Sequence, residues 1–388
     1  MKQSLRRLAP VIGLIALTLL AACRHDEIVI PIEYDTLPIA PDPTAERIGI
    51  YLLNEGNMGS NKATIDYIDL RSAAYFRNMY AERNPEIIKE LGDVGNDIQI
   101  YGSRLYAVIN CSHKVEVMDA YTLKRIGQVD IPNCRYIRFS DGNAYVSAYV
   151  GPVAIDPNAQ LGAVYRVDTA TLQITAKCTV GYQPEELVIT DDRIYVANSG
   201  GYRAPNYDHT LSILDRREMR QVEKLPVGPN LHRCRLDRYG KLWVSSRGDM
   251  AKQPARLMVV DTKAGAKVTD TLDIAVSDLS LVGDSLYFIS SQWNPVTEAN
   301  DIAYGIVNVA TKQLVTSRLI TDGTEADIAV PYGIIVDPAT RDFYITDAKN
   351  YVSSGQVHCY DRNGRKRWSM RAGDIPAHLC ILYKTPRQ

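Results

Sequence analysis

The feature that most constrains the fold of this chain is a short apolar pattern that recurs seven times. In each copy an aromatic residue stands among apolar and β-branched residues, a composition typical of a buried β-strand. The aromatic positions are Tyr51, Tyr106, Tyr145, Tyr195, Trp243, Tyr287 and Tyr344. They are 55, 39, 50, 48, 44 and 57 residues apart. Units of this length fit the four-stranded blades of a β-propeller better than helical repeats.

Each unit has the same internal order. A first strand reaches the aromatic strand through a tight turn such as 141–142, an Asp-Gly pair typical of β-hairpins. A third strand follows and ends in a turn-forming Asp, for example Asp215, whereas the sixth unit has Asn308 there. A fourth strand is more polar, as suits the outer edge of a blade.

The two ends of the repeat region complement each other. The first unit has an aromatic strand at Tyr51 without a strand before it, and residues 378–382 form a first strand with nothing after it. Joining them completes a sheet and removes two exposed edges. The sequence therefore predicts an all-β fold, a seven-bladed β-propeller over residues 47–388, closed by N- and C-terminal strands in one blade and lacking a second domain.

The blades also resemble a known repeat. Residues 194–199 (IYVANS), 211–215 (LSILD) and 227–229 (VGP) are similar to the YVTN-type β-propeller repeat, and the resemblance covers residues 47–383. The segment 54–57 (NEGN) resembles the opening of propeller lipoproteins displayed on Gram-negative gut anaerobes. One branch of these is the surface cobalamin-binding lipoprotein that sits over a TonB-dependent transporter. Overall likeness to that branch implies binding of cobalamin or other corrinoids.

Residues 1–22 have the composition of an export signal. Three basic residues precede an apolar run that is too short to span a bilayer comfortably. The run ends at residues 20–23 (LAAC), which resemble a lipobox and imply a lipid on Cys23; a plain secretory signal with a coincidental cysteine is the alternative. Asp26 and Glu27 resemble a surface-export signal of some Gram-negative gut bacteria. We expect a lipidated N-terminus and proline-rich tether over 23–46, anchored in the outer membrane and facing the exterior.

Charge and motifs argue against several classes of function. The formal net charge of −1 provides no basic field for nucleic acid. The sequence contains no His-Glu-x-x-His, Gly-x-Ser-x-Gly, P-loop or EF-hand motif and no Cys-x-x-Cys pair. We therefore expect that the protein is not an enzyme and that it contains neither a metal site nor a cofactor. Cys111 and Cys134 fall in loops on one predicted face, so a disulfide between them remains open.

Long loops gather on one face of the predicted propeller. The links between second and third strands are long, for example 150–162 and 292–303, and they leave the ring on one side, where binding sites usually lie. The chain has 24 Tyr against 4 Phe. Tyr and Trp offer rigid amphipathic contact area, and Asn adapts its hydrogen bonds. The alternative is that these rings only cover the core.

The predicted ligand-binding residues fall into two groups. The long-loop group is Asn57, Tyr149, Tyr202, Tyr207, Trp293, Tyr304 and Tyr351. A second location, at the central channel, adds Arg135, His232 and Tyr332. Histidines in or beside these loops also offer an imidazole ligand for a corrinoid's cobalt, although an ordinary polar role is commoner; they are His113, His209, His232 and His378.

Three functions stay in competition. The first is a surface lipoprotein that captures a small-molecule nutrient, cobalamin above all, and passes it to a TonB-dependent outer-membrane transporter. A glycan- or protein-binding propeller would use the same aromatic rim. A lactonase-like enzyme would need an acid, a base and a cation at the channel, for which Glu185, His232 and Arg233 are placed. The expected location at the cell surface argues against a lactonase, because phosphogluconate lactonases act in the cytoplasm.

Overall fold

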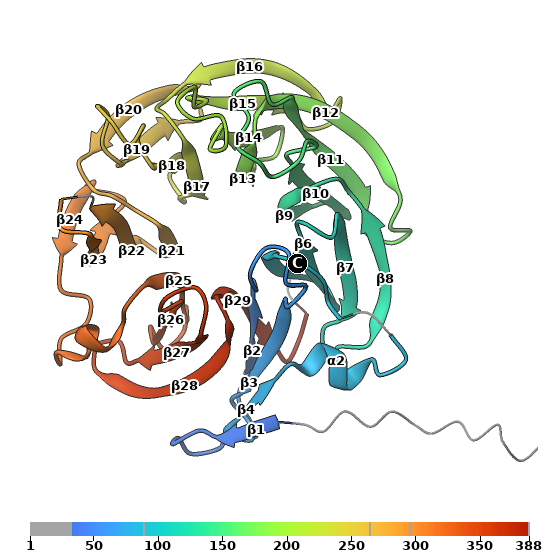
Figure 1. Cartoon of the computed structure of the whole chain (residues 1–388), viewed down its shortest axis with the longest axis vertical. Coiled ribbons are helices and arrows are strands. Elements are labelled where there is room, and N and C mark those ends of the chain that lie inside the picture. The colour runs from blue at the N-terminus through green and yellow to red at the C-terminus, as the bar shows by residue number, and fades with distance from the viewer. Residues whose placement is uncertain (1–32, 88–89, 264, 295, 387–388) are drawn as a thin grey trace, which may run out of the picture. The chain divides into compact units, whose positions relative to one another are not determined.

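The computed structural model describes residues 33–386 except 88–89, 264 and 295. The chain divides into two units, Met1–Pro31 and Ile32–Gln388, and every described element belongs to the second. There, seven antiparallel sheets, the blades, stand around a common axis (Figure 1). The predicted all-β, seven-bladed propeller is confirmed. The predictions for the signal peptide, Cys23, Asp26 and Glu27 lie outside the described residues.

Blades 1 to 4 follow the chain around the ring. Blade 1 holds β1 (Glu33–Thr36), β2 (Arg47–Asn54), β3 (Thr64–Asp69), β4 (Ala74–Arg77) and β29 (Pro376–Tyr383). Blade 2 holds β5 (Gly95–Tyr101), β6 (Arg104–Ile109), β7 (Lys114–Asp119) and β8 (Arg125–Asp130). Blade 3 holds β9 (Cys134–Ser140), β10 (Asn143–Ala148), β11 (Leu161–Asp168) and β12 (Ile174–Tyr182). Blade 4 holds β13 (Pro184–Ile189), β14 (Arg193–Asn198), β15 (Thr210–Asp215) and β16 (Arg220–Pro226).

Blades 5 to 7 complete the ring. Blade 5 holds β17 (Leu231–Leu236), β18 (Lys241–Ser246), β19 (Arg256–Asp261) and β20 (Lys267–Leu272). Blade 6 holds β21 (Asp278–Val282), β22 (Ser285–Asn294), β23 (Ala299–Asn308) and β24 (Gln313–Thr316). Blade 7 holds β25 (Pro331–Val336), β26 (Phe343–Asp347), β27 (Ser354–Tyr360) and β28 (Lys366–Asp374).

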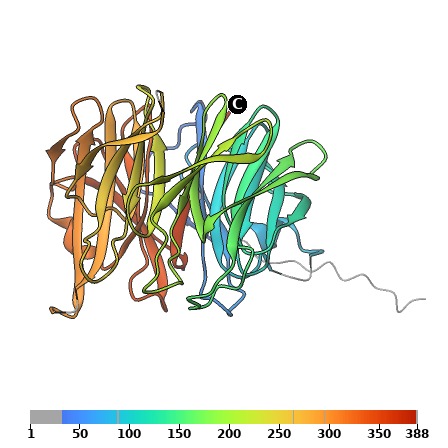
Figure 2. The same cartoon turned by 90° about the horizontal axis from the view of Figure 1, so that it is seen from above.

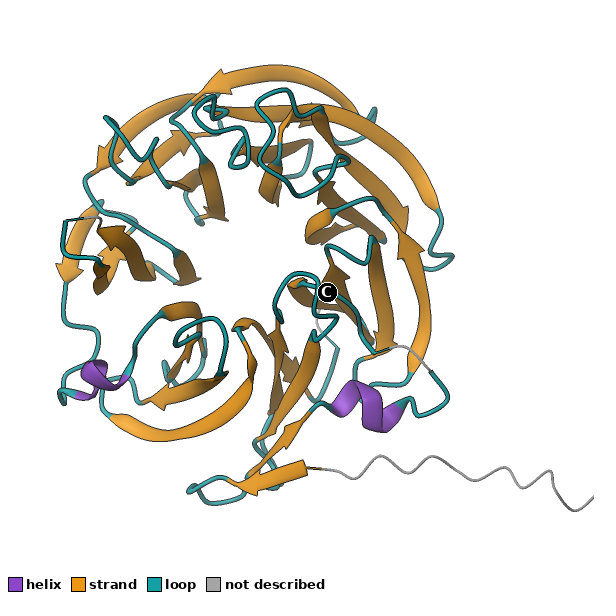
Figure 3. Ribbon diagram, in the orientation of Figure 1, coloured by secondary structure: helices purple, strands orange, loops and turns teal. Residues whose placement is uncertain are grey.

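Helix is scarce in the described chain, and strands make up almost all of its regular structure (Figure 3). The helical pieces are α2 (Met79–Arg83) and the 3₁₀ turn η1 (Thr324–Asp327), both on links from a fourth strand to the next blade. Among the described residues no helix has the length and apolar character that crossing a membrane requires.

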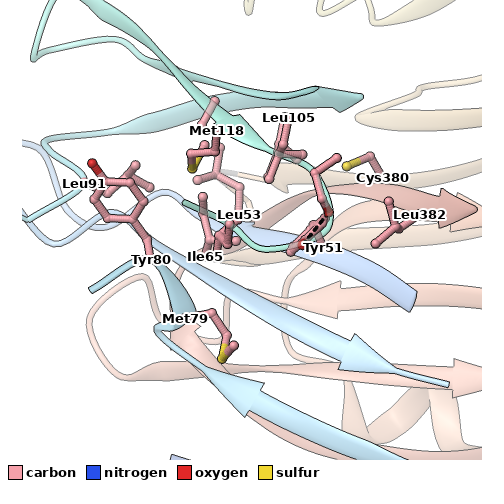
Figure 4. Close-up of a cluster of buried hydrophobic side chains, with 14 of the residues drawn as sticks. Tyr51, Leu53, Ile65, Met79, Tyr80, Leu91, Leu105, Met118, Cys380 and Leu382 are labelled. Carbon is pink, nitrogen blue, oxygen red and sulfur yellow. Dashed lines mark hydrogen bonds between the residues drawn. The ribbon is translucent and has the colours of Figure 1, made fainter. Parts of the chain in front are cut away.

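Blade 1 closes the ring as predicted. The last strand, β29, pairs antiparallel with β2, with Leu52 opposite Leu379. Cys380 and Leu382 of β29 pack with Tyr51 and Leu53 of β2 in a buried cluster that continues into blade 2 (Figure 4). Closure by segments from both ends of the chain thus buries apolar side chains and hides the edge of β2.

The predicted tether is shorter than expected, because β1 pairs with β4 as a fifth, outermost strand of blade 1. Leu37, directly after β1, is 1% exposed and belongs to the core that blade 1 shares with blade 7. The described part of the segment 33–46 therefore belongs to the propeller.

The repeating residues have the structural roles that their pattern suggests. All seven aromatic anchors are buried, and the Tyr51 hydroxyl donates to the Ala120 carbonyl across the blade boundary, at 2.8 Å. At the ends of third strands a side-chain oxygen accepts from the backbone of the following turn. Asp215 accepts from Arg217 and Glu218, and Asn308 does the same for Ala310 and Thr311.

Two faces of the ring differ in their links. Strands run between these faces, as Figure 2 shows from the side. The antiparallel order sends the second-to-third links, the fourth-to-first links and the starts of the inner strands to the same face, here called the long-loop face. One predicted long loop is wrong: most of 292–303 forms a hairpin arm, in which Asn294 of β22 pairs with Ala299 of β23.

Candidate functional site

A cavity of about 580 Å³ lies on the ring axis at the long-loop face. Every blade contributes to its lining, in blade order through Glu55, Asn96, Arg135, Glu185, His232, Gln292 and Tyr332. The volume is in the range of small-molecule sites, which lie preferentially where several elements converge. The cavity is therefore the candidate site.

Irregular pairing of the inner strands shapes the cavity. In a regular strand neighbouring side chains face opposite ways. Between Leu231 and Cys234 the pairing of β17 with β18 shifts register, and similar shifts occur near the starts of β5, β9, β13 and β25. Both His232 and the adjacent Arg233 consequently line the cavity. A bulge of this kind re-aims side chains and doubles the polar groups at the axis.

Arg135 and Glu185 form a buried ion pair beside the cavity. The guanidinium Nη2 and Nε of Arg135 donate to Glu185 Oε2 at 2.9 and 3.1 Å. The Tyr149 hydroxyl donates to Glu185 Oε1 at 2.7 Å, and Arg247 Nη1 approaches the same oxygen at 3.4 Å. Burial alone would raise the pKa of Glu185, but attraction to Arg135 and Arg247 outweighs burial and lowers it. Glu185 is therefore ionised at neutral pH.

Tyr136 links Arg233 to His232. Arg233 Nη1 donates to the Tyr136 hydroxyl at 3.0 Å, and that hydroxyl lies 3.1 Å from His232 Nε2. Burial lowers the pKa of His232 far below its ordinary value, and the charges of Arg247, Arg233, Arg135 and His378 lower it further. The imidazole is therefore neutral at neutral pH.

Glu55 marks the blade 1 side of the cavity. Its Oε2 accepts from the Tyr332 hydroxyl at 3.0 Å, and its Oε1 lies 3.2 Å from His378 Nε2. The Tyr332 ring meets the Tyr351 ring edge-on, with the centroids 5.8 Å apart. Burial raises the pKa of Tyr332 well above its usual value, and the charge of Glu55 adds to this. Tyr332 therefore stays a neutral donor.

The polar lining is concentrated among residues with little exposure. A group of polar or charged residues, here called the floor, is nearly buried: Arg135, Tyr136, Glu185, His232 and Arg233. The exposed lining residues, here called the collar, are apolar or aromatic: Met58 (63% exposed), Met250 (81%), Trp293 (64%) and Tyr351 (41%). Exposed apolar groups gathered around a cavity are typical of a binding surface.

Eight of the ten predicted ligand-binding residues line this one cavity. They are Asn57, Arg135, Tyr149, Tyr202, His232, Trp293, Tyr332 and Tyr351. The long-loop and central-channel locations, predicted separately, are thus the upper and lower parts of a single site. Sequence reasoning missed Met58, Tyr136, Arg247 and Met250, because neither the Tyr/Asn signal nor the expected side-chain alternation selects them.

Two of the predicted residues lie elsewhere. Tyr304 is buried on β23 in the core shared by blades 6 and 7, because the segment expected to be a loop continues the strand. Tyr207 lines a separate depression with His209 and Pro229 at the junction of blades 4 and 5. The structure therefore contradicts Tyr304 as a rim residue and removes Tyr207 from the central site.

The side chains of Cys111 and Cys134 show whether the two cysteines form a disulfide. Cys111 and Cys134 are both free thiols. The Cys134 thiol is buried and directed at the Lys114 carbonyl, at 3.3 Å, so no disulfide joins the pair. Within the described ranges, no group of three or more His, Cys, Asp or Glu side chains is arranged to hold a metal ion.

A family model matches most of the chain. Residues 48–374 match the model of a family described as a domain of unknown function, DUF5074. No curated protein matches the chain.

Solved structures are similar in fold. A hypothetical selenium-binding protein from Sulfolobus tokodaii is 11% identical, with a TM-score of 0.62 over 88% of this chain and 96% of that one. Kuenenia stuttgartiensis hydrazine synthase is 14% identical, with a TM-score of 0.55 over 83% and 94%. A quinonprotein alcohol dehydrogenase-like protein from Bacteroides thetaiotaomicron VPI-5482 is 10% identical, with a TM-score of 0.59 over 86% and 78%. These similarities support the propeller fold. The function has to be inferred from the residues of the site.

Proposed function

The chain belongs to the DUF5074 family, and we propose that it is a surface lipoprotein whose central cavity captures a small organic nutrient for a TonB-dependent outer-membrane transporter. Cobalamin or another corrinoid is the first ligand to test. The observation that carries the proposal is the change from an apolar, aromatic collar to a polar floor within one rigid cavity. A preformed site of this kind binds without a large ordering cost.

The collar and the amide groups suit a corrinoid. Trp293 and Tyr351 offer flat contact area for an extended ring system. The amide side chains of Asn57, Asn230 and Gln292 also line the cavity, where they can meet a ligand that carries many amides. One of their acceptors, Asn230 Oδ1, is buried without a hydrogen-bond partner among the described residues. A buried acceptor of this kind favours a ligand donor.

The size of the cavity sets how such a ligand would lie. A volume of about 580 Å³ suits a drug-sized molecule, and a whole corrinoid is larger. We therefore place part of the corrinoid in the cavity and the rest against the exposed collar. His232 Nε2 is engaged by Tyr136, so the proposal includes no imidazole ligand for cobalt from His232.

We favour binding over catalysis because the groups that a lactonase-like reaction would need are occupied by one another. Glu185 accepts from Arg135 and Tyr149, and His232 contacts Tyr136. A glycan-binding propeller would use the same Trp and Tyr platforms, so glycans are the second ligand class to test if cyanocobalamin does not bind.

Trp293→Ala tests the collar. Loss of this exposed ring should weaken cyanocobalamin binding by roughly thirtyfold, because a truncated aromatic anchor costs about 2 kcal/mol or more. Tyr351→Ala should weaken it as well. Titration calorimetry measures both affinities. Lys124→Ala is the control, because Lys124 lies between β7 and β8 on the opposite face and should bind as the parent does. A parent that does not bind cyanocobalamin at micromolar concentration contradicts the corrinoid assignment.

Cys23→Ala tests the anchor. We expect the variant to leave the membrane fraction while its propeller remains folded, because the described propeller begins ten residues or more beyond Cys23. Fractionation followed by immunoblotting locates the protein, and circular dichroism of the released material checks its strand content. Membrane retention equal to that of the parent would refute the lipoprotein assignment.

A further inference from the structure

Apart from the contact between Glu55 and His378, the ion pairs around the cavity separate into two networks. The larger network balances three arginines against three carboxylates: Arg138, Arg233 and Arg235 with Asp97, Glu186 and Asp278. The smaller network joins Arg135 and Arg247 to the single carboxylate of Glu185. The smaller network therefore has one more positive than negative charge. Glu55, the other carboxylate of the cavity wall, contacts Tyr332 and His378 and not these arginines.

The excess charge belongs to Arg247. Arg135 is the better paired of the two arginines, with its side chain 14% exposed and 2.9 Å from Glu185, whereas the Arg247 side chain is 32% exposed and 3.4 Å from it. A guanidinium has five N–H donors. Arg247 uses one of them on Glu185, and its side chain makes no other hydrogen bond to the described residues. It lines the cavity, so its remaining donors are available to a ligand.

Tyr136 and His232 provide a second unused donor. A phenol and a neutral imidazole together carry two polar protons, and the 3.1 Å contact between them uses one. Arg233 can only donate to Tyr136, so it does not accept the second proton. The second proton lies either on the Tyr136 oxygen or on His232 Nδ1, which has no partner among the described residues. Both residues line the cavity floor.

We propose that Arg247 and the unused donor of the Tyr136–His232 pair form an anion subsite, which takes a carboxylate or phosphate group of the ligand. The inference rests on the proposed function in that it takes the cavity as the ligand site. Both groups line the same cavity, and Arg135, which shares Glu185 with Arg247, lies 5.7 Å from the centroid of the Tyr136 ring. A guanidinium matches the two oxygens of a carboxylate or phosphate. The collar would then contact the apolar part of the same molecule.

Methionine methyl NMR can test the subsite with simple anions. Met250 lines the cavity close to Arg247 in sequence, and its ¹³C-methyl signal is assigned with Met250→Leu. Inorganic phosphate and, separately, acetate are titrated at constant ionic strength against chloride. We expect saturable shifts of the Met250 signal in the millimolar range. The anion that saturates at lower concentration identifies the ligand group as phosphate or carboxylate.

Variants assign the effect to the proposed groups. Arg247→Gln should weaken binding of the anion by about tenfold or more, because a hydrogen bond to a charged group is lost. Arg247→Lys keeps the charge without the fork and should be intermediate, and Tyr136→Phe should also weaken binding. Arg220→Gln, at an exposed arginine on the outer strand β16, should leave the titration unchanged. Equal saturation in Arg247→Gln and the parent, or no saturable shift with either anion, overturns the subsite.

A parallel titration with cyanocobalamin separates the two proposals. Saturable anion shifts without cyanocobalamin binding support the subsite and contradict the corrinoid assignment. Cyanocobalamin binding without saturable anion shifts contradicts the subsite alone.

Discussion

A chain that ends at Asp374, and so lacks β29, should lose its cooperative unfolding transition. The deletion removes the inner strand of blade 1 and exposes the edge of β2. It also removes the buried side chains of Ala377, Cys380 and Leu382, and Leu379 and Ile381 from a second cluster. Apolar burial worth about 1.5–3 kcal/mol per large side chain sums with the lost strand pairing to on the order of 10 kcal/mol. That equals the whole stability of an ordinary domain.

Differential scanning calorimetry measures this effect, and a second deletion is the control. A chain that starts at Leu37 lacks β1, which is also one edge strand of blade 1 but lies outermost and is mostly exposed. This control should keep a single transition near that of the parent. Ring closure would not depend on β29 if the chain ending at Asp374 melted in one transition of similar enthalpy.

Glu186→Gln should lower the free energy of unfolding at pH 7 by about 3–5 kcal/mol, the cost of breaking a buried ion pair from one side. Glu186 is 2% exposed, and its carboxylate forms ion pairs with Arg138, Arg233 and Arg235. It also accepts from the Cys234 backbone N–H at 2.8 Å. The glutamine keeps the shape but removes the charge, so three guanidinium groups lose their shared counterion. Urea unfolding followed by circular dichroism measures the change.

The pH dependence of this effect identifies its origin. Burial would raise the pKa of Glu186, but the charges of Arg235, Arg138 and Arg233 prevail and lower it to about 2. Because the folded pKa lies below the unfolded value near 4.5, the stabilisation is complete above that value and is lost as the pH falls through about 2. The gap between parent and variant should therefore narrow from pH 5 toward pH 2.

Glu218→Gln is the matched control. Glu218 is an exposed glutamate that pairs with Arg220 on the outside of blade 4. Its replacement should change the unfolding free energy by less than about 1 kcal/mol. A gap between the parent and Glu186→Gln that stays constant down to pH 2 would mean that lost packing, and not lost charge, destabilises the variant.

The architecture could be predicted because its signal is periodic and local. Buried aromatic anchors such as Tyr195 and Trp243 recur at blade spacing, and turn-forming Asp residues end the third strands. Closure by β29 followed from counting strands in the first and last units. The extra strand β1 was missed because a proline-rich flank lacks alternation, and its place depends on a free edge of β4 that only the folded blade provides.

The site could be predicted only in part. Residues at the starts of inner strands, such as Arg135 and His232, were found because blade topology brings those starts to the axis. Tyr136 lines the cavity through a register shift, which depends on pairing with the next strand and leaves no local pattern. Tyr304 was misplaced for a related reason: β22 and β23 extend beyond the common blade length, so a residue expected in a loop lies in the core.

The pairing of β2 with β29 also sets the order of events in folding. Arg47 pairs with Tyr383, so this contact has nearly the largest sequence separation that the described chain allows. Contacts of this kind form late, because a long loop must close before they give any gain. Glu55 follows β2, and Ile375 precedes β29, at the wall of the cavity. A chain still emerging from the ribosome can therefore complete most of its blades before the cavity exists. The cavity assembles only when the last strand arrives, so an intact cavity requires the complete propeller.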